Sequence, residues 1–492
     1  MRHLLFTSLV TCFLLPLGAQ SIPIDFTGDP GKPVVVENPA TGKTLFFFYP
    51  DRLSSEAFAR GGNPWKACEV DSKTLQVLRT SAGSSLRVAN GNDLKFRVIC
   101  RVSFGDEYYI AMENNKKCAL YRFSGQRLDM SVADSFKVGK GMRIIGGVTN
   151  AGGGYILCTR KVRREGHQMV VYEIGEGGRL QEHRFRVDVR RNYLIEQAFK
   201  RDFKPLSVEY EMEMDPKPAS TPVKMFAGNR KLFLTFDDAN VGSVYTNTTA
   251  ILRVMTLDLT TDSLRIKPYY YTDSLARDAL YERRSSYIYE DKLFQLYLNN
   301  EQILFRIRDL GSGKTLFIKS LLRDDTIEGI ASSPILVPGR GLLGVEKEYR
   351  SVRKFMKRFS KFDPFIQVRR AGANYLLCAG GFEEVKFLQG VTSAGPGFTT
   401  ATPTGAWVAD GAPSAYATSY ERSFSFYSAI DARTMTRSDV YYEKPLIAAY
   451  NDVLEKAKKP RDQALFRIGG QFYIGYFEKQ RGAYRFLRIE NY

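Results

Sequence analysis

A short hairpin corner recurs along this chain and constrains its fold more than any other feature. An apolar strand ends in Asp, a few turn residues follow, and then Thr or Ser precedes Leu or Met. Residues 70–75 (VDSKTL) and 430–435 (IDARTM) are the clearest copies. Asp at the end of a strand accepts hydrogen bonds from the backbone amides that follow it, which bends the chain into a hairpin. The repeat therefore predicts a fold built from similar antiparallel hairpins.

The corners belong to longer units of similar length. Extended versions start at Asp258 and Asp309, and glycine turns near residues 124 and 175 fill the same place. Where no extra material intervenes, successive corners are about 50 residues apart, close to the length of one propeller blade. Glycine-rich turns divide a unit into four expected strands, for example residues 143–148, 155–161, 168–174 and 180–187.

This pattern resembles the β-propeller superfamily, and the resemblance covers most of the chain after residue 20. It implies an all-β fold of about seven four-stranded blades with helical insertions. An eighth blade is an alternative, because residues 335–337 and 342–345 look like the first two strands of a further unit. Two β-sandwich domains are the rival fold, since evenly spaced strands suit them as well.

The last unit stops after its third strand, which ends near residue 489. We expect residues 22–26 or 33–37, from the other end of the chain, to supply the missing fourth strand. Helices are expected in the insertions. Val345, Tyr349, Val352, Met356 and Phe359 recur at helical spacing with basic residues between them, Pro445 opens a second helix, and residues 192–203 and 274–283 are further candidates.

Residues 1–20 have the pattern of an export signal. Arg2 supplies the positive start, residues 4–17 the apolar stretch, and residues 17–20 (LGAQ) a small-residue cleavage site. A signal that ends in Ala-Gln resembles those of secreted Bacteroidetes proteins, which implies a periplasmic or extracellular location. No later stretch is long and apolar enough to span a bilayer. We expect residues 21–492 to form a single propeller domain with insertions near residues 190–222, 322–363, 386–420 and 443–462.

The charge of the chain indicates a class of partner. Its formal net charge is +18, and a basic exported protein is attracted to acidic glycans, lipid phosphates or nucleic acid. We expect an acidic polymer or an unknown protein as the partner, leave contact with a membrane surface open, and do not expect nucleic acid. The chain is expected to be a monomer.

The cysteines and histidines suggest no cofactor. After the expected signal, Cys68, Cys100, Cys118, Cys158 and Cys378 form an odd set whose spacing matches no metal site. Cys158 and Cys378 occupy the same place in two similar strands, which favours small buried hydrophobic residues. His167 and His183 lack metal-ligand spacing, and residues 311–315 (GSGKT) form a corner rather than a phosphate-binding loop. We expect no metal and no cofactor.

No local catalytic motif appears, but an active site assembled from separate blades would leave none, so the question of catalysis stays open. The expected function is that of an exported β-propeller that binds or scaffolds an acidic glycan, a surface polymer or a protein. The alternative is a polysaccharide-active hydrolase or lyase with its site in the central funnel, which a converging cluster of carboxylates, Tyr and Arg would favour. Long loops on a rigid scaffold usually carry binding. The candidate ligand-binding residues on such loops are Trp407, Tyr416, Arg163, Arg164, Arg350, Arg353 and Lys357.

These residues also have ordinary structural explanations. A charged hairpin tip at Arg163 and Arg164 is usually just solvated. The helix around Arg353 could simply pack its apolar stripe on the propeller and present its charges to water.

Overall fold

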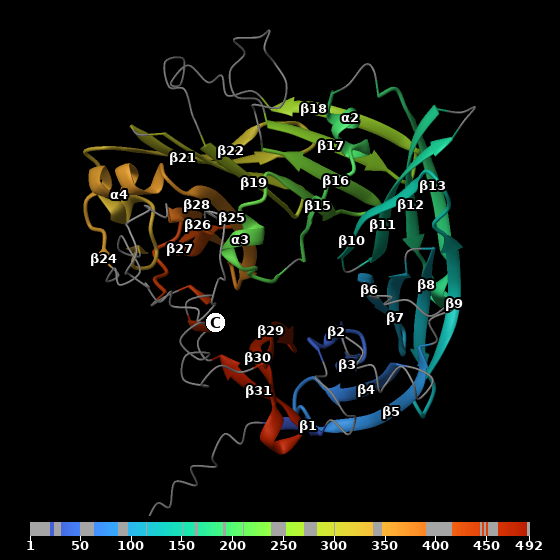
Figure 1. Cartoon of the computed structure of the whole chain (residues 1–492). Helices are drawn as coiled ribbons and strands as arrows, with labels where there is room; N and C mark the ends of the chain where they lie inside the picture. Colours follow the sequence, from blue (N-terminus) through green and yellow to red (C-terminus); the bar gives the residue numbers. More distant parts are fainter. Residues whose placement is uncertain are drawn as a thin grey trace, which may run out of the picture. The chain divides into compact units, whose positions relative to one another are not determined.

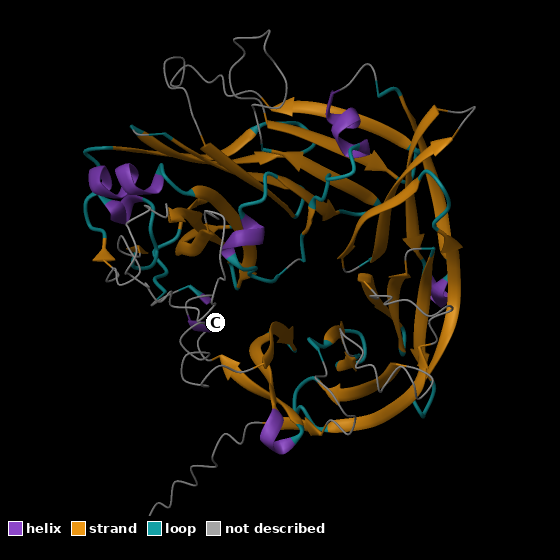
Figure 2. Cartoon of the chain, viewed as in Figure 1, coloured by secondary structure: helices purple, strands orange, loops and turns teal. Residues whose placement is uncertain are grey.

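The computed structural model describes residues 20–23, 31–49, 63–86, 97–114, 116–150, 152–162, 166–189, 193–209, 211–237, 252–269, 283–299, 301–337, 347–389, 416–442, 445–446, 449–450 and 461–489. Strands dominate it and helices are few (Figure 2). The chain divides into two compact units. The first contains residues 1–138, 174–180 and 450–492, and the second contains residues 139–173 and 181–449. Export itself stays a prediction, because residues 1–19 lie outside the described part.

Seven sheets, six of four strands and one of five, are the blades of a β-propeller (Figure 1). The first unit holds blade 1, with β2 (Val34–Asn38), β3 (Lys43–Phe48), β4 (Asn63–Asp71) and β5 (Val77–Leu86); blade 2, with β6 (Arg97–Phe104), β7 (Glu107–Asn114), β8 (Lys117–Ser124) and β9 (Asp129–Lys137); and blade 7, with β29 (Arg461–Ile468), β30 (Gln471–Glu478), β31 (Ala483–Ile489) and β1 (Gln20–Pro23).

The second unit holds the other four blades. They are blade 3, with β10 (Met142–Asn150), β11 (Gly153–Val162), β12 (Gly166–Ile174) and β13 (Leu180–Val187); blade 4, with β14 (Leu206–Ser207), β15 (Val223–Ala227), β16 (Lys231–Phe236), β17 (Leu252–Asp258) and β18 (Ser263–Tyr269); blade 5, with β19 (Arg283–Tyr289), β20 (Lys292–Leu298), β21 (Gln302–Asp309) and β22 (Thr315–Leu322); and blade 6, with β25 (Asp363–Ala371), β26 (Asn374–Gln389), β27 (Tyr416–Asp431) and β28 (Thr436–Arg437).

The predicted fold class is confirmed, and the blade count is seven. Of the two strands expected to begin an eighth blade, residues 335–337 give β23 (Leu336–Val337), which pairs with β24 (Lys347–Glu348) as a two-stranded ribbon. Residues 342–345 lie outside the described part. The alternative of two β-sandwiches is wrong, because every blade is a separate sheet whose strands pair with their neighbours in the sequence. The exception is β1, which pairs with β31, and the short β14 pairs with its neighbour β15 in parallel rather than antiparallel.

Blade 7 takes its fourth strand from the N-terminal part of the chain, as the sequence predicts. β1 pairs antiparallel with β31, with Ile22 opposite Tyr484. The Ile22 side chain is fully buried and packs in one cluster with Tyr484 and Phe486. The other candidate, residues 33–37, instead falls mostly in β2, the first strand of blade 1.

The corners have the hydrogen bonding that the sequence predicts, and each links the last two strands of its blade. Asp71 Oδ1 accepts from the Lys73 and Thr74 amides at 3.0 and 2.7 Å and from Thr74 Oγ1 at 3.0 Å. Asp431 repeats this arrangement. These hydrogen bonds lower the pKa of both carboxyl groups. In the GSGKT corner, Asp309 Oδ1 accepts from the Ser312 amide and hydroxyl, each at 2.6 Å.

Helices lie in the connections between strands, some between blades and some within a blade. They are α2 (Tyr193–Phe199), α3 (Pro216–Ala219) and α4 (Val352–Phe359), with one-turn helices η1 (Glu176–Gly178), η2 (Ile327–Gly329) and η3 (Lys479–Arg481). The predicted helix from Val345 starts later than expected, because Lys347–Glu348 pairs as a strand and the Tyr349 amide donates to the Ile335 carbonyl at 3.0 Å. The helix at Pro445 begins as expected, with the Ala449 amide donating to the Pro445 carbonyl at 3.1 Å. Residues 274–282 lie outside the described part.

All five described cysteines are buried thiols. Cys158 lies in β11 and Cys378 in β26, the second strands of their blades, so the prediction of equivalent buried positions is confirmed. Burial raises the pKa of Cys118 to about 12 and that of Cys378 well above its ordinary value.

These thiols should resist labelling in the native protein. Burial shields all five side chains from a reagent. The raised pKa values of Cys118 and Cys378 also leave little of the reactive thiolate at neutral pH. We expect no labelling of these five residues by a thiol reagent within minutes at pH 7.5, and complete labelling in denaturant. Mass spectrometry of the peptides identifies each site. Rapid native labelling of Cys158 or Cys378 would contradict the packing described here.

Candidate functional site

The helix α4 presents a basic face on a fixed base. Val352, Phe355, Met356 and Phe359 are buried, and the Phe355 ring makes edge-to-face contacts with Phe424 and Phe426 of β27 at a centroid distance of 5.8 Å. On the opposite side, Arg353, Lys354 and Lys357 are exposed, and the helix contains no acidic residue. The ordinary explanation, an amphipathic helix packed on the propeller, accounts for its apolar side.

The bases of this face are nearly free of acidic partners. Arg350, just before the helix, is 83% exposed and pairs with Glu348 at 3.3 Å. Among the residues that the structure describes, Arg353, Lys354 and Lys357 form no ion pair. We call Arg350, Arg353, Lys354 and Lys357 the α4 basic face.

The structure does not test the other predicted ligand residues. Trp407, Arg163 and Arg164 lie outside the described residues. Tyr416 begins β27, but its side chain is not described. The structure therefore brings together Arg350, Arg353 and Lys357 and leaves the rest of the predicted set as a prediction.

A segment between β14 and β15 lies beside β25, and no sequence pattern predicts this position. The Gln367 side chain accepts from the Met214 amide at 2.6 Å and donates to the Met214 carbonyl at 2.9 Å. Buried Glu213 accepts from Arg369 Nε at 3.2 Å and from the Tyr427 hydroxyl. Further along the segment, Lys217 Nζ donates a hydrogen bond to Glu421 of β27. Residues 211–217 thus cover blade 6 along its first strand.

Carboxylates, tyrosines and an arginine converge where this segment begins. The Tyr289 hydroxyl donates to Glu211, and the Arg370 amide donates to Glu211 Oε2 at 3.2 Å. The Tyr375 hydroxyl donates to Glu290 at 2.6 Å, and Arg370 Nη1 lies 3.5 Å from the same carboxylate. Burial and these carboxylates raise the pKa of both tyrosines. Both tyrosines are buried and both carboxylates already accept hydrogen bonds. Through Glu211, the cluster attaches the segment to Tyr289 of blade 5 and to Arg370 of blade 6.

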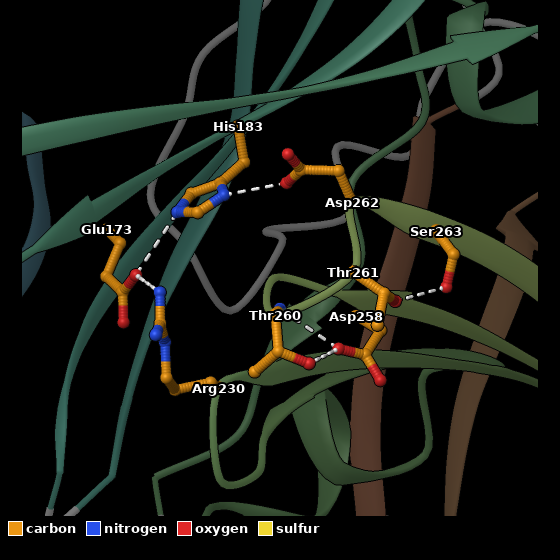
Figure 3. Close-up of polar contacts among 8 residues, drawn as sticks. All are labelled: Glu173, His183, Arg230, Asp258, Thr260, Thr261, Asp262 and Ser263. Atoms are coloured by element: carbon orange, nitrogen blue, oxygen red, sulfur yellow. Dashed lines mark hydrogen bonds and ion pairs between the residues drawn. The ribbon is translucent and has the colours of Figure 1, made fainter.

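The second unit also contains a buried histidine between two carboxylates (Figure 3). His183 of β13 is 4% exposed. Its Nδ1 lies 2.8 Å from Asp262 Oδ1, in the β17–β18 turn, and its Nε2 lies 3.2 Å from Glu173 Oε2, at the end of β12. Arg230, in the β15–β16 turn, donates to the same Glu173 oxygen at 3.1 Å. Blade 3 supplies the histidine and Glu173, and blade 4 supplies Asp262 and Arg230.

This histidine cluster could be found only in part from the sequence. His183 and Phe185 alternate in β13 and both face inward, and a buried histidine needs hydrogen-bond partners. That alternation marks His183 as buried, but nothing in the sequence identifies Asp262, which is 79 residues away, as its partner.

No protein-family model matches the chain, and no curated protein matches it. Similar solved structures include the Dos1 propeller, with 11% identity over 73% of this chain and 82% of that chain and a TM-score of 0.33. A subtype N10 neuraminidase-like protein of A/little yellow-shouldered bat/Guatemala/060/2010 has 8% identity over 73% and 94% of the two chains and a TM-score of 0.30. The GH43_1 enzyme from Xanthomonas citri has 10% identity over 58% and 82% and a TM-score of 0.22. Likenesses this distant do not bear on what the chain does.

Proposed function

We propose that this chain is an exported β-propeller that binds an acidic polymer, such as an acidic glycan, through the α4 basic face. The observation that carries the proposal is a set of exposed bases on a helix held in place by buried aromatic packing. Binding of a polyanion to a rigid charged surface loses little conformational entropy in the protein, because the scaffold is ordered before binding. In the described part of the chain, no helix is long and apolar enough to cross a membrane.

The alternative, a polysaccharide-active hydrolase or lyase, has less support. Hydrolysis of a glycosidic bond generally needs one carboxyl group to protonate the leaving oxygen and a second to act as base or nucleophile. Glu211 and Glu290 are the carboxylates of the cluster between blades 5 and 6, but both are bonded to tyrosine and to Arg370. The proposed binding function does not require these two carboxylates to take part in a reaction.

The triple variant Arg353→Ser/Lys354→Ser/Lys357→Ser tests the proposal. Three exposed ionic contacts of roughly 0.5 kcal/mol each would make binding about tenfold weaker. The measurement is the dissociation constant for heparin and for poly-glutamate at several salt concentrations. The expected wild-type affinity falls with added salt, because exposed charges are screened, and the variant should show a shallower salt dependence.

The matched control removes the same charge elsewhere in the second unit. Arg265, Lys314 and Arg433 are exposed bases at or near corners of blades 4, 5 and 6, and their triple Ser variant should keep the wild-type dissociation constant within about twofold. Equal loss of binding in both variants would assign the effect to net charge and would refute a site at α4.

A further inference from the structure

Three bases of the α4 basic face form a compact group. Arg353, Lys354 and Lys357 are exposed and lie within five residues of one another on α4, while the fourth base, Arg350, already pairs with Glu348. Lys357 is four residues from Arg353 and three from Lys354. Side chains at these spacings are neighbours on a helix surface, with about 5–6 Å between their Cβ atoms. Three positive charges can therefore contact one small anionic group together.

The stability of the helix does not explain this grouping. Like charges at these spacings repel each other and destabilise a helix. Arg353 and Lys354 also lie in the first turn, where the helix dipole disfavours positive charge, and that turn contains no acidic residue. Within the part of the chain that the structure describes, no carboxylate pairs with any of the three bases. A bound anion would reduce this repulsion.

The number of acceptor oxygens in an anion sets how many bases it can contact. A carboxylate has two oxygens, whereas a phosphate ester has three strong acceptor oxygens. A sulfate ester also has three terminal oxygens. The three oxygens surround one central atom and point in different directions, so each can accept a hydrogen bond from a different base. Three neighbouring bases match that arrangement better than they match a single carboxylate.

Given the polymer binding proposed above, on which this inference rests, we propose that the acidic groups recognised at α4 are sulfate or phosphate esters. Arg353, Lys354 and Lys357 contact one such ester together. The packing of Phe355 against β27 holds the helix in place, so the backbone that carries the three bases is ordered before the ester binds. A polymer that carries carboxylates is attracted by the same charges but offers fewer oxygens to each group of bases.

Dextrans with different acidic groups test this assignment on one sugar backbone. Dextran sulfate, dextran phosphate and carboxymethyl dextran are compared at equal charge per sugar and equal salt. We expect the wild-type full chain to bind at least one of the two ester polymers about two- to fivefold more tightly than carboxymethyl dextran, because the ester gains one further ionic contact at an exposed site. The ester polymer with the lower dissociation constant distinguishes sulfate from phosphate.

The outcomes separate the ester assignment from the polymer binding itself. A preference for an ester that disappears in Arg353→Ser/Lys354→Ser/Lys357→Ser supports both. Equal affinity of the wild type for all three dextrans, with weaker binding in the triple variant, would overturn the ester assignment and leave the proposed function standing. Unchanged binding of every dextran by the triple variant would refute both.

A double-mutant cycle tests whether the bases share one ester. The dissociation constant for dextran sulfate, or for dextran phosphate if that polymer binds more tightly, is measured for Arg353→Ser, Lys357→Ser and the double variant. If both bases contact one group, the loss in the double variant should differ by more than about twofold from the product of the two single losses. Arg353→Ser combined with Lys314→Ser, at an exposed corner of blade 5, is the control and should show simple multiplication. Simple multiplication for Arg353 and Lys357 as well would refute a shared ester.

Discussion

Replacing Lys224 with Met should destabilise the protein by about 3–5 kcal/mol, because it leaves a buried carboxylate without its cation. Lys224 of β15 is 1% exposed and Asp237, just after β16, is 4% exposed. Lys224 Nζ donates to Asp237 Oδ2 and to Ser285 Oγ, each at 3.0 Å. A lone charge in such a site loses its water shell with little compensation.

The size of this effect follows from what the lysine connects. Ser285 lies on β19 and its Oγ also accepts from the Ile366 amide of β25 at 3.2 Å. Asp237 Oδ2 accepts from the Ser286 amide at 2.9 Å. One buried network thus joins β15 of blade 4 to the first strands of blades 5 and 6, so its loss should loosen all three blades.

Denaturant unfolding checks this expectation against a matched substitution. Lys231→Met, on β16 of the same blade, removes a lysine that is 44% exposed and lies 3.6 Å from Asp258. That change should cost less than about 1 kcal/mol, as exposed ion pairs usually do. The double variant Lys224→Met/Asp237→Asn should recover much of the loss, because the unpaired charge is gone. A single variant no less stable than the Lys231 control would contradict this account.

Local hydrogen bonding explains why the blades could be predicted from the sequence. At Asp71 and Asp431 the carboxylate and the amides it accepts from lie within three residues of each other. Leu75 and Met435, which follow, both adopt left-handed backbone angles with φ of 58° and 54°. All the information for such a corner stands in six consecutive residues, and its repetition then implies repeated blades.

Contacts between distant segments explain what the sequence could not predict. An insertion near residues 190–222 was expected, but its position beside β25 depends on Gln367, which is 153 residues from its partner Met214. The partner of His183 is similarly distant. At α4 the helical spacing predicts the helix correctly from Val352 onward. Tyr349 matches the same spacing, but its backbone amide donates to the carbonyl of Ile335, the residue before β23. Periodicity describes which face is apolar and not where an element starts.

The substitution Glu213→Gln should cost about 3 kcal/mol and free the segment that covers blade 6. Glu213 is 4% exposed and accepts from Arg369 Nε and from the Tyr427 hydroxyl. Burial is the largest single influence on the pKa of Arg369 and by itself would lower it, but Glu213 and Tyr427 together outweigh burial and raise this pKa. For Tyr427, burial raises the pKa. Gln keeps the shape of Glu but removes the charge that stabilises the buried guanidinium.

This effect should reach beyond the segment itself. The Tyr427 oxygen also accepts from the Leu446 amide at 2.8 Å, at the start of the Pro445 helix. Hydrogen exchange measured by mass spectrometry should therefore accelerate both in residues 211–217 and around Leu446 in Glu213→Gln. Glu421→Gln is the matched control, because it removes the exposed partner of Lys217 on the same segment, and it should change exchange only near Lys217. If Glu213→Gln left exchange around Leu446 unchanged, the buried network would not couple the two insertions.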